Sequence, residues 1–306
     1  MNVAEIRKSR WFPLVWLIPG ALALLALAIL AAQGLRTLEP VQAFIAQYPG
    51  ESHLPDWAPV GFPAWLGWQH FLNAFLIVLI IRSGWLIRTT TRPSAYWTRK
   101  NSGLLKTKKP PKKITLEQWI HLSLDAVWGV NGVLFVILLF ATGQWVRVVP
   151  ISWDVFPNAL SVGLQYASLN WPVENGWVNY NSLQLISYFV TIFVAAPLAA
   201  ITGLRMSPAW SNDWKALNRV YPIELARKIH FPVMLYFVLF IIVHVTLVFA
   251  SGALRNLNHM YASRDDQSWV GFWFFAGSLV LIIAGWVALR PALLRPLASL
   301  TGKVSR

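Results

Sequence analysis

Six long apolar stretches constrain the fold of this chain more than any other feature of its sequence. A helix needs about 20 apolar residues to cross the hydrocarbon layer of a bilayer, and each stretch is long enough. The composition agrees, since 56% of the residues are hydrophobic and only 12% are charged. The sequence therefore predicts an all-α membrane protein with six transmembrane helices, at residues 11–33, 64–87, 119–141, 182–204, 229–252 and 268–289.

Basic residues in the loops predict the topology. Lys and Arg are concentrated in loops 88–118 and 205–228 and in the tail after residue 289, whereas the other three loops hold few. Because cytoplasmic loops of membrane proteins collect Lys and Arg, we expect both termini in the cytoplasm. The first span follows a basic segment, Arg7–Arg10, and is longer than a normal signal-peptide core, which favours an uncleaved anchor. The same rule accounts for the net charge of +14, so membrane lipid rather than nucleic acid is the expected partner.

The chain contains no cysteine. This excludes structural disulfides, thiolate nucleophiles, Cys-ligated iron–sulfur clusters and the covalent attachment of c-type haem. Any haem must therefore be held without a covalent link and by other ligands.

Four of the six histidines lie on predicted spans: His70, His121, His230 and His244. Ionisable side chains inside a membrane are costly and suggest a functional site. His230 and His244 are fourteen residues apart on the fifth span, which places them within about 40° of the same helix face and ~21 Å apart along its axis.

The predicted topology sorts these histidines by depth. His121 lies at the cytoplasmic level of His230, and His70 lies at the outer level of His244. Each same-level pair can supply two imidazoles to one haem iron, because a neutral imidazole gives one nitrogen to a metal and keeps the other for a hydrogen bond. The sequence thus predicts two haem sites, one near each membrane surface.

Other residues are candidates around these sites. Gly84, Gly129 and Gly132 would leave room for a macrocycle, although ordinary helix packing explains them equally well. Arg82 on the cytoplasmic side and Arg255 on the outer side are candidate partners of haem propionates, and snorkelling towards the headgroups is the alternative for each. Further cytoplasmic-side candidates are Arg88, Arg205, Arg227 and Lys228. Of the two loop histidines, His53 and His259, the second is the better candidate for a quinone headgroup or a proton relay.

A haem-free reading stays open, because a lone membrane histidine commonly serves packing or proton transfer. The spans hold few acids, chiefly Asp125 with Glu117 at a span entrance. This argues against an ion transporter, which usually needs acids within the membrane. The chain also has no His-Glu-x-x-His motif of a metalloprotease.

Three stretches resemble the bacterial cytochrome b561 / nickel-hydrogenase cytochrome b family, which includes the gamma subunits of membrane formate dehydrogenases. They are Trp68-Gln69-His70-Phe71-Leu72-Asn73, Trp119-Ile120-His121, and the helix from Arg227-Lys228-Ile229-His230-Phe231-Pro232 to Val243-His244-Val245. The resemblance implies a four-helix core in spans 2 to 5 and two haem b groups ligated by the four histidines. It also implies a quinone site, a partner enzyme bearing molybdenum, nickel or iron–sulfur centres, and a place in the bacterial cytoplasmic membrane.

The resemblance also divides the chain and separates it from relatives. We expect an N-terminal anchor helix with its outer loop at 1–63, the di-haem core at 64–252, and a sixth span with a basic tail at 253–306. The respiratory cytochrome b of quinol–cytochrome c oxidoreductases carries a His pair on each of two helices, whereas Gly84 and Phe135 stand fourteen residues after His70 and His121 here. The additional first span reverses the core relative to the nearest relatives, so the side on which a partner docks stays open.

Three functions follow as hypotheses. The first is a di-haem b-type cytochrome that carries electrons across the bilayer between the quinone pool and a partner redox enzyme of a respiratory chain. The second is a stand-alone quinol-oxidising cytochrome with the same haems. The third is a haem-free six-span transporter.

The pairing makes a direct prediction for His244→Ala. This variant should lose one b-type haem and keep the other, because only one of the two pairs is broken. A pyridine haemochrome count and a reduced-minus-oxidised spectrum of the purified variant measure this. Retention of both haems would contradict the pairing.

Overall fold

The computed structural model describes residues 12, 14–102, 106–107, 110–171 and 175–306. The basic segment Arg7–Arg10 lies outside these residues. Within them, six helices are long and apolar enough to cross a membrane, and they confirm the predicted all-α membrane fold. The six are Val15–Arg36, Ala64–Thr89, Leu116–Ala141, Ser182–Met206, Ile223–Ala250 and Val270–Ala288.

The chain forms two compact units whose boundaries differ from the expected segments. The first unit combines residues 1–58 with 146–188, and the second combines 59–145 with 189–306. The functional division at residues 64 and 252 stays a prediction.

The first unit contains a helix that the sequence pattern does not predict. Besides α2 (Leu14–Arg36), α3 (Glu39–Gln47) and most of α7 (Ser182–Phe189), it holds α6 (Val155–Ala167) within the expected outer loop. A short helical turn, η2 (Gln144–Arg147), precedes α6.

Gly50 ties the first unit together. Its N–H donates to Asn158 Oδ1 at 2.9 Å, and its carbonyl accepts from the Ser182 N–H at 2.8 Å. Its φ of +130° is one that side chains rarely adopt, and a Cβ here would lie 2.6 Å from Val162 Cγ2. Only glycine fits this position.

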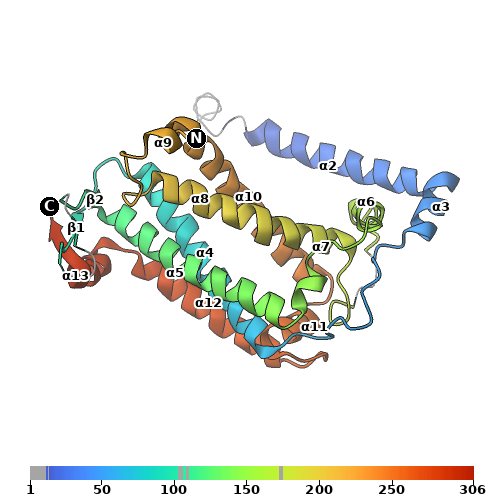
Figure 1. Ribbon diagram of the computed structural model, residues 1–306. Helices are drawn as coiled ribbons and strands as arrows, with labels where there is room; N and C mark the ends of the chain where they lie inside the picture. The colour runs from blue at the N-terminus through green and yellow to red at the C-terminus, as the bar shows by residue number, and fades with distance from the viewer. Residues whose placement is uncertain (1–11, 13, 103–105, 108–109, 172–174) are drawn as a thin grey trace. The chain divides into compact units, whose positions relative to one another are not determined.

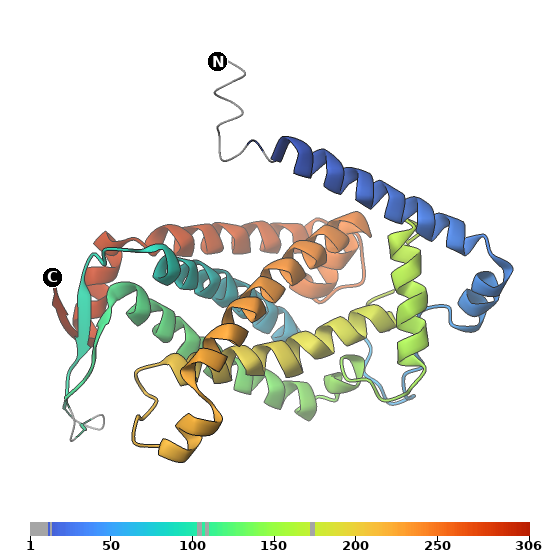
Figure 2. The ribbon, with the colours of Figure 1, turned by 90° about the horizontal axis from the view of Figure 1, so that it is seen from above.

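The second unit is a bundle of long helices (Figures 1 and 2). It contains α4 (Ala64–Thr89), α5 (Leu116–Ala141), α8 (Ala196–Met206), α10 (Ile223–Ala250) and α12 (Val270–Ala288), with the π-helical turn η3 (Val190–Ala195) before α8. Helix α4 packs against α5 and α12, and α8 packs against α10. Large apolar side chains face outward, such as Val130, which is 74% exposed, and Leu239, which is 62% exposed. Such a surface suits lipid, where the helix satisfies its own backbone hydrogen bonds.

One end of this bundle carries a small sheet that the sequence analysis did not predict. The antiparallel strands β1 (Tyr96–Arg99), β2 (Lys113–Thr115) and β3 (Gly302–Ser305) have the order β2-β1-β3. Helix α13 (Pro291–Thr301) leads into β3, and α9 (Lys215–Val220) precedes α10. We call the end of the bundle that carries this sheet the sheet end.

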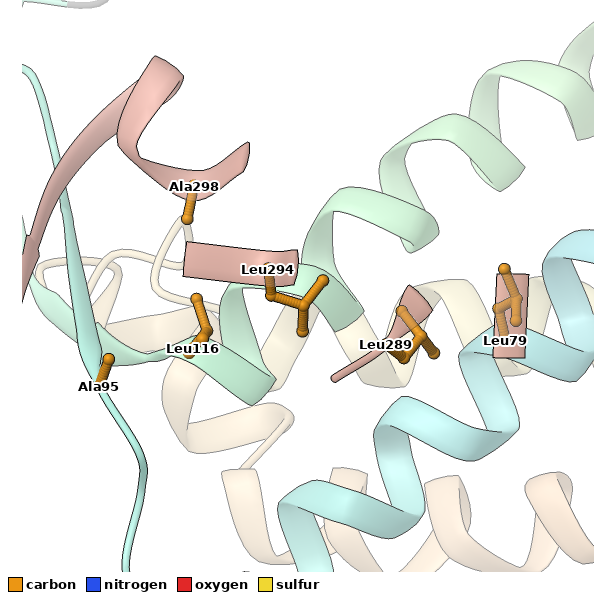
Figure 3. Packing of buried hydrophobic residues seen from close by; sticks show 6 residues of the cluster. All are labelled: Leu79, Ala95, Leu116, Leu289, Leu294 and Ala298. Carbon is orange, nitrogen blue, oxygen red and sulfur yellow. The ribbon is translucent and has the colours of Figure 1, made fainter. Parts of the chain in front are cut away.

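A buried apolar cluster fastens the sheet end to the helices (Figure 3). Leu116 at the start of α5 packs with Leu294 and Ala298 of α13, and the Trp97 ring N–H donates to the Ala298 carbonyl at 3.0 Å. The remaining members of the cluster are Leu79, Ala95 and Leu289. Because Thr115 also forms a capping box with Gln118, the first turns of α5 are held firmly.

The opposite end carries α11 (Ala253–Leu257) and the π-helical turn η4 (Asn258–Ala262), and we call it the α11 end. Asn258 is fully buried there. It accepts from the Gly271 N–H at 2.6 Å and donates to Asp266 Oδ1 at 2.8 Å. A Cβ on Gly271 would collide with the backbone of Leu257 and Asn258. The start of α12 is therefore pressed against the α11 end.

This close approach predicts different results for two glycines of α12. Gly271→Ala should destabilise the protein by about 1–3 kcal/mol, the usual cost of overpacking. Gly277→Ala should have little effect or stabilise slightly, because its Cβ would meet nothing within 4 Å and alanine favours helix. Thermal unfolding of both variants in the same detergent measures this, and equal melting temperatures would contradict the contact.

Candidate haem-ligand site

The four span histidines meet in two pairs within the second unit. The rings of His70 on α4 and His244 on α10 have centroids 6.2 Å apart. The rings of His121 on α5 and His230 on α10 have centroids 6.4 Å apart. These are the pairs that the sequence predicts from depth alone. His121 lies in the second turn of α5, so the His121–His230 pair is at the sheet end. The His70–His244 pair is at the α11 end.

The ring spacing fits one metal atom between each pair. Metal–imidazole bonds are about 2.0 Å long, so two rings on opposite sides of one metal have centroids about 6 Å apart. Among the described residues, no group of three or more His, Cys, Asp or Glu side chains could hold a metal ion. A bare metal ion normally takes three or four protein ligands, whereas haem brings its own equatorial nitrogens and needs only axial ligands. The donor set therefore fits haem.

Two hydroxyl groups hold the rings at the sheet end. Ser83 Oγ on α4 lies 2.9 Å from His121 Nδ1, and Thr202 Oγ1 on α8 lies 2.8 Å from His230 Nδ1. Both hydroxyl residues are fully buried. In each ring Nδ1 is thus occupied by a hydrogen bond, which leaves Nε2 for another role.

Each of these hydroxyl residues is followed by a glycine that faces the same ring. A Cβ on Gly84 would lie 3.2 Å from His121 Cε1, and one on Gly203 would lie 3.6 Å from His230 Cε1. The glycines let the backbones approach the rings closely. Gly84, one of the glycine candidates from the sequence, thus lies against the His121 ring.

A cavity of about 1610 Å³ opens beside the sheet-end pair. His121, His230, Gly84 and Gly129 contribute to its wall, and Gly132 does not. Ligand pockets usually measure about 300–1,000 Å³, so the space at this end is large enough for a bulky planar group.

The pair at the α11 end is packed differently. The His70 ring meets the edge of the Tyr261 ring at 5.6 Å, and the His244 ring stacks on Phe240 at 5.5 Å. His70 Nδ1 is buried without a hydrogen-bond partner in the described part of the chain. Buried polar atoms are nearly always paired, so His70 differs from the sheet-end rings, whose Nδ1 atoms have hydroxyl partners.

The arginine candidates lie against protein groups. The Arg82 guanidinium covers the Trp286 ring of α12 at 4.5 Å. Arg82 is twelve residues after His70, or about 120° around the helix from it, which explains why it faces α12. Arg88 also stacks on a protein ring, that of Phe231 at 4.1 Å, but it lines the cavity as well.

Arg255 belongs to a polar cluster at the α11 end. It donates to both Asp265 oxygens, at 2.7 and 3.1 Å, while His259 Nε2 lies 2.7 Å from Oδ1 of the same carboxylate. The pKa of Asp265 is lowered to about 2, chiefly by the hydrogen bond from Arg255 and secondly by the hydrogen bond from His259. His259 is buried and stacks on Phe62 at 5.7 Å. The propionate role of Arg255 and the quinone or relay role of His259 stay predictions.

Sequence reasoning missed Ser83 and Thr202. The signal that could have found them is the repeated hydroxyl–glycine dipeptide, Ser83-Gly84 and Thr202-Gly203. This signal is weak, because small residues and hydroxyls are common where membrane helices pack.

The glycine contact predicts a selective loss in Gly84→Val. The added side chain should push the His121 ring aside, because even a Cβ is tight at 3.2 Å. If each pair holds one haem, as the sequence predicts, the variant should lose the haem of the sheet-end pair and retain the other, as measured by haem per protein. The second haem serves as an internal control for folding, and full retention of both would contradict the contact.

Comparison with known proteins agrees with this geometry. The family model described as prokaryotic cytochrome b561 matches residues 61–262, a range that contains all four span histidines. A protein of Azospira oryzae, described as a putative protein-methionine-sulfoxide reductase subunit YedZ1, is 28% identical over 207 residues, covering 61% of this chain and 88% of its own length. No solved structure matches the chain. The chain therefore belongs to the prokaryotic cytochrome b561 family, a family of haem-binding membrane proteins that transfer electrons.

Proposed function

We propose that this chain holds two haem b groups, one between each histidine pair, and carries electrons across the bilayer between the quinone pool and a partner redox enzyme. Haem, when bound, supplies reversible one-electron chemistry at its iron. His70 with His244, and His121 with His230, would hold the two groups, and the protein would set their spacing and surroundings.

The observation that carries this proposal is that two histidine pairs, each with the ring spacing of one shared metal atom, have one member each on helix α10. His230 and His244 lie fourteen residues apart on α10, or about 21 Å along its axis. That is most of the ~30 Å thickness of the hydrocarbon layer. Groups held by His70 and His244 at one level and by His121 and His230 at the other would therefore lie near opposite membrane surfaces.

The large cavity supports a quinone at the sheet end. Its volume of about 1610 Å³ exceeds the usual ligand pocket and leaves room for a ring beside a haem. Oxidation of a quinol releases two electrons and two protons, and Asp125 is an acid in the cavity wall. We assign the proton-accepting role to this carboxylate.

A partner enzyme is the remaining part of the proposal. The relative from Azospira oryzae is described as a subunit of a reductase, which favours a role in a complex over a stand-alone oxidase. Under the predicted topology the sheet end faces the cytoplasm and the α11 end faces outward. A partner bearing molybdenum, nickel or iron–sulfur centres would then exchange electrons with the haem at the surface opposite the quinone.

One contact favours a second candidate function. Asp125 Oδ2 lies 3.6 Å from His121 Nε2, one turn along α5. This distance is too long for a hydrogen bond, but such a pair could pass a proton in a haem-free transporter. The two functions use His121 Nε2 differently, because the first needs this nitrogen as a haem ligand and the second needs it for proton transfer.

Matched variants of this pair separate the two functions. His121→Ala should lose one of two b-type haems, because one of the two imidazoles that would hold it is removed. Asp125→Asn should retain both haems and slow their reduction by an added quinol several-fold. Haem per protein and the rate of haem reduction by duroquinol are the two readouts. Colourless wild-type protein from haem-replete cells, with proton transport lost in Asp125→Asn, would overturn the electron-transfer proposal in favour of the relay.

A further inference from the structure

We infer that Ser83 and Thr202 are positioning residues that fix the proton of each sheet-end histidine on Nδ1 and thereby lower the reduction potential of the haem held there. The inference rests on the proposed ligand roles of the histidines. According to this inference, the two hydroxyl groups help to set the difference in reduction potential between the two haems.

The hydroxyls complete two short hydrogen-bond chains. Ser83 Oγ, which contacts His121 Nδ1, donates its own proton to the Ile80 carbonyl at 3.0 Å. Thr202 Oγ1, which contacts His230 Nδ1, has the carbonyls of Leu198 and Ala199 at 2.5 and 3.1 Å. In both cases the acceptor carbonyl lies one turn earlier on the same helix as the hydroxyl.

Counting protons gives the direction of these chains. A neutral imidazole that gives Nε2 to a metal carries its proton on Nδ1. The hydroxyl must then accept from that N–H, and its single proton is left for the backbone carbonyl behind it. Both donors of each hydrogen-bond chain, the ring N–H and the hydroxyl, are then satisfied, and both hydroxyl residues are fully buried.

The same device occurs twice, on two different helices. Ser83-Gly84 on α4 holds His121, and Thr202-Gly203 on α8 holds His230. In each copy the hydroxyl fixes the ring nitrogen while the glycine places open backbone against Cε1 of the same ring. Together they fix both the tautomer and the rotation of the imidazole, which a general packing role would not require.

At the α11 end, His70 lacks the hydrogen bond to Nδ1 that both sheet-end histidines have. His70 Nδ1 has no hydrogen-bond partner in the described part of the chain, and its ring contacts the edge of Tyr261 instead. A hydrogen bond from Nδ1–H makes an imidazole a more basic ligand. A more basic ligand stabilises oxidised iron, so the haem of the sheet-end pair should have the lower potential.

Asp125 requires the test to be made within one site. Its carboxylate lies 3.6 Å from His121 Nε2, and a negative charge there also favours oxidised iron. A difference between the two haems could therefore come from Asp125 alone. Variants of the hydroxyls at constant Asp125 separate the two effects.

The experiment is a redox titration of the full-length protein with both haems bound. His121→Ala and His244→Ala first assign each spectral component to its pair. Ser83→Ala and Thr202→Val should each raise the reduction potential of the sheet-end haem by ~59 mV, which is a tenfold change in its one-electron reduction equilibrium. The potential of the other haem should stay unchanged. The conservative variants Ser83→Thr and Thr202→Ser keep the hydroxyl and should therefore have the wild-type potential.

Ser123→Ala is the matched control. Ser123 lines the same cavity, and its hydroxyl donates to the Trp119 carbonyl of its own helix at 2.8 Å. This variant should shift neither potential. A shift as large as that of Ser83→Ala would overturn the inference, because loss of any cavity hydroxyl would then suffice.

The outcomes keep the inference apart from the proposed function. Two haems with unshifted potentials in Ser83→Ala and Thr202→Val overturn the inference and leave the proposed function standing. If both variants lose the sheet-end haem, its return in Ser83→Thr and Thr202→Ser supports the hydroxyl role, and its continued absence overturns it. Absence of haem from the wild-type protein counts against the proposed function itself.

Discussion

The lack of hydrogen-bond partners in the bilayer governs the rest of this structure. A polar side chain on a transmembrane helix must find its partner inside the protein or pay several kcal/mol. The four span histidines are therefore confined to the bundle interior, where they meet in pairs 6.2 and 6.4 Å apart. Ser83 and Thr202 satisfy one nitrogen of each sheet-end ring by the same rule. Under the proposed function, a haem would lie between the rings of each pair.

Helix α10 links the two sites, and the bundle ends fix their depth. Because His230 and His244 lie on one continuous helix, their separation is set by helix geometry rather than by loops. At the sheet end, the cluster around Leu116 and Leu294 anchors the start of α5 and hence His121. At the α11 end, Asn258 and Gly271 press α12 against η4, which carries Tyr261 onto the His70 ring. The ordinary packing of the bundle thus positions both pairs.

Long-range regularities made the spans and the histidine pairs predictable from sequence. Span length, loop charge and the fourteen-residue spacing of His230 and His244 each follow from the bilayer and the helix period. The small sheet was not predictable, because its strands have only three or four residues and β1 pairs with β3 from more than two hundred residues away, as Trp97 does with Val304. Ser83 and Thr202 were missed because their partners lie on other helices. Arg82 shows that a charge near a site can still face the neighbouring helix.

The most direct test of the account is the number of haems bound by the purified wild-type chain. A pyridine haemochrome assay against protein concentration from amino-acid analysis measures this ratio. The account predicts two b-type haems per chain, each with the low-spin spectrum of two imidazole ligands. A ratio of one, or a colourless protein from haem-replete cells, would contradict it, because one or both histidine pairs would then serve another purpose.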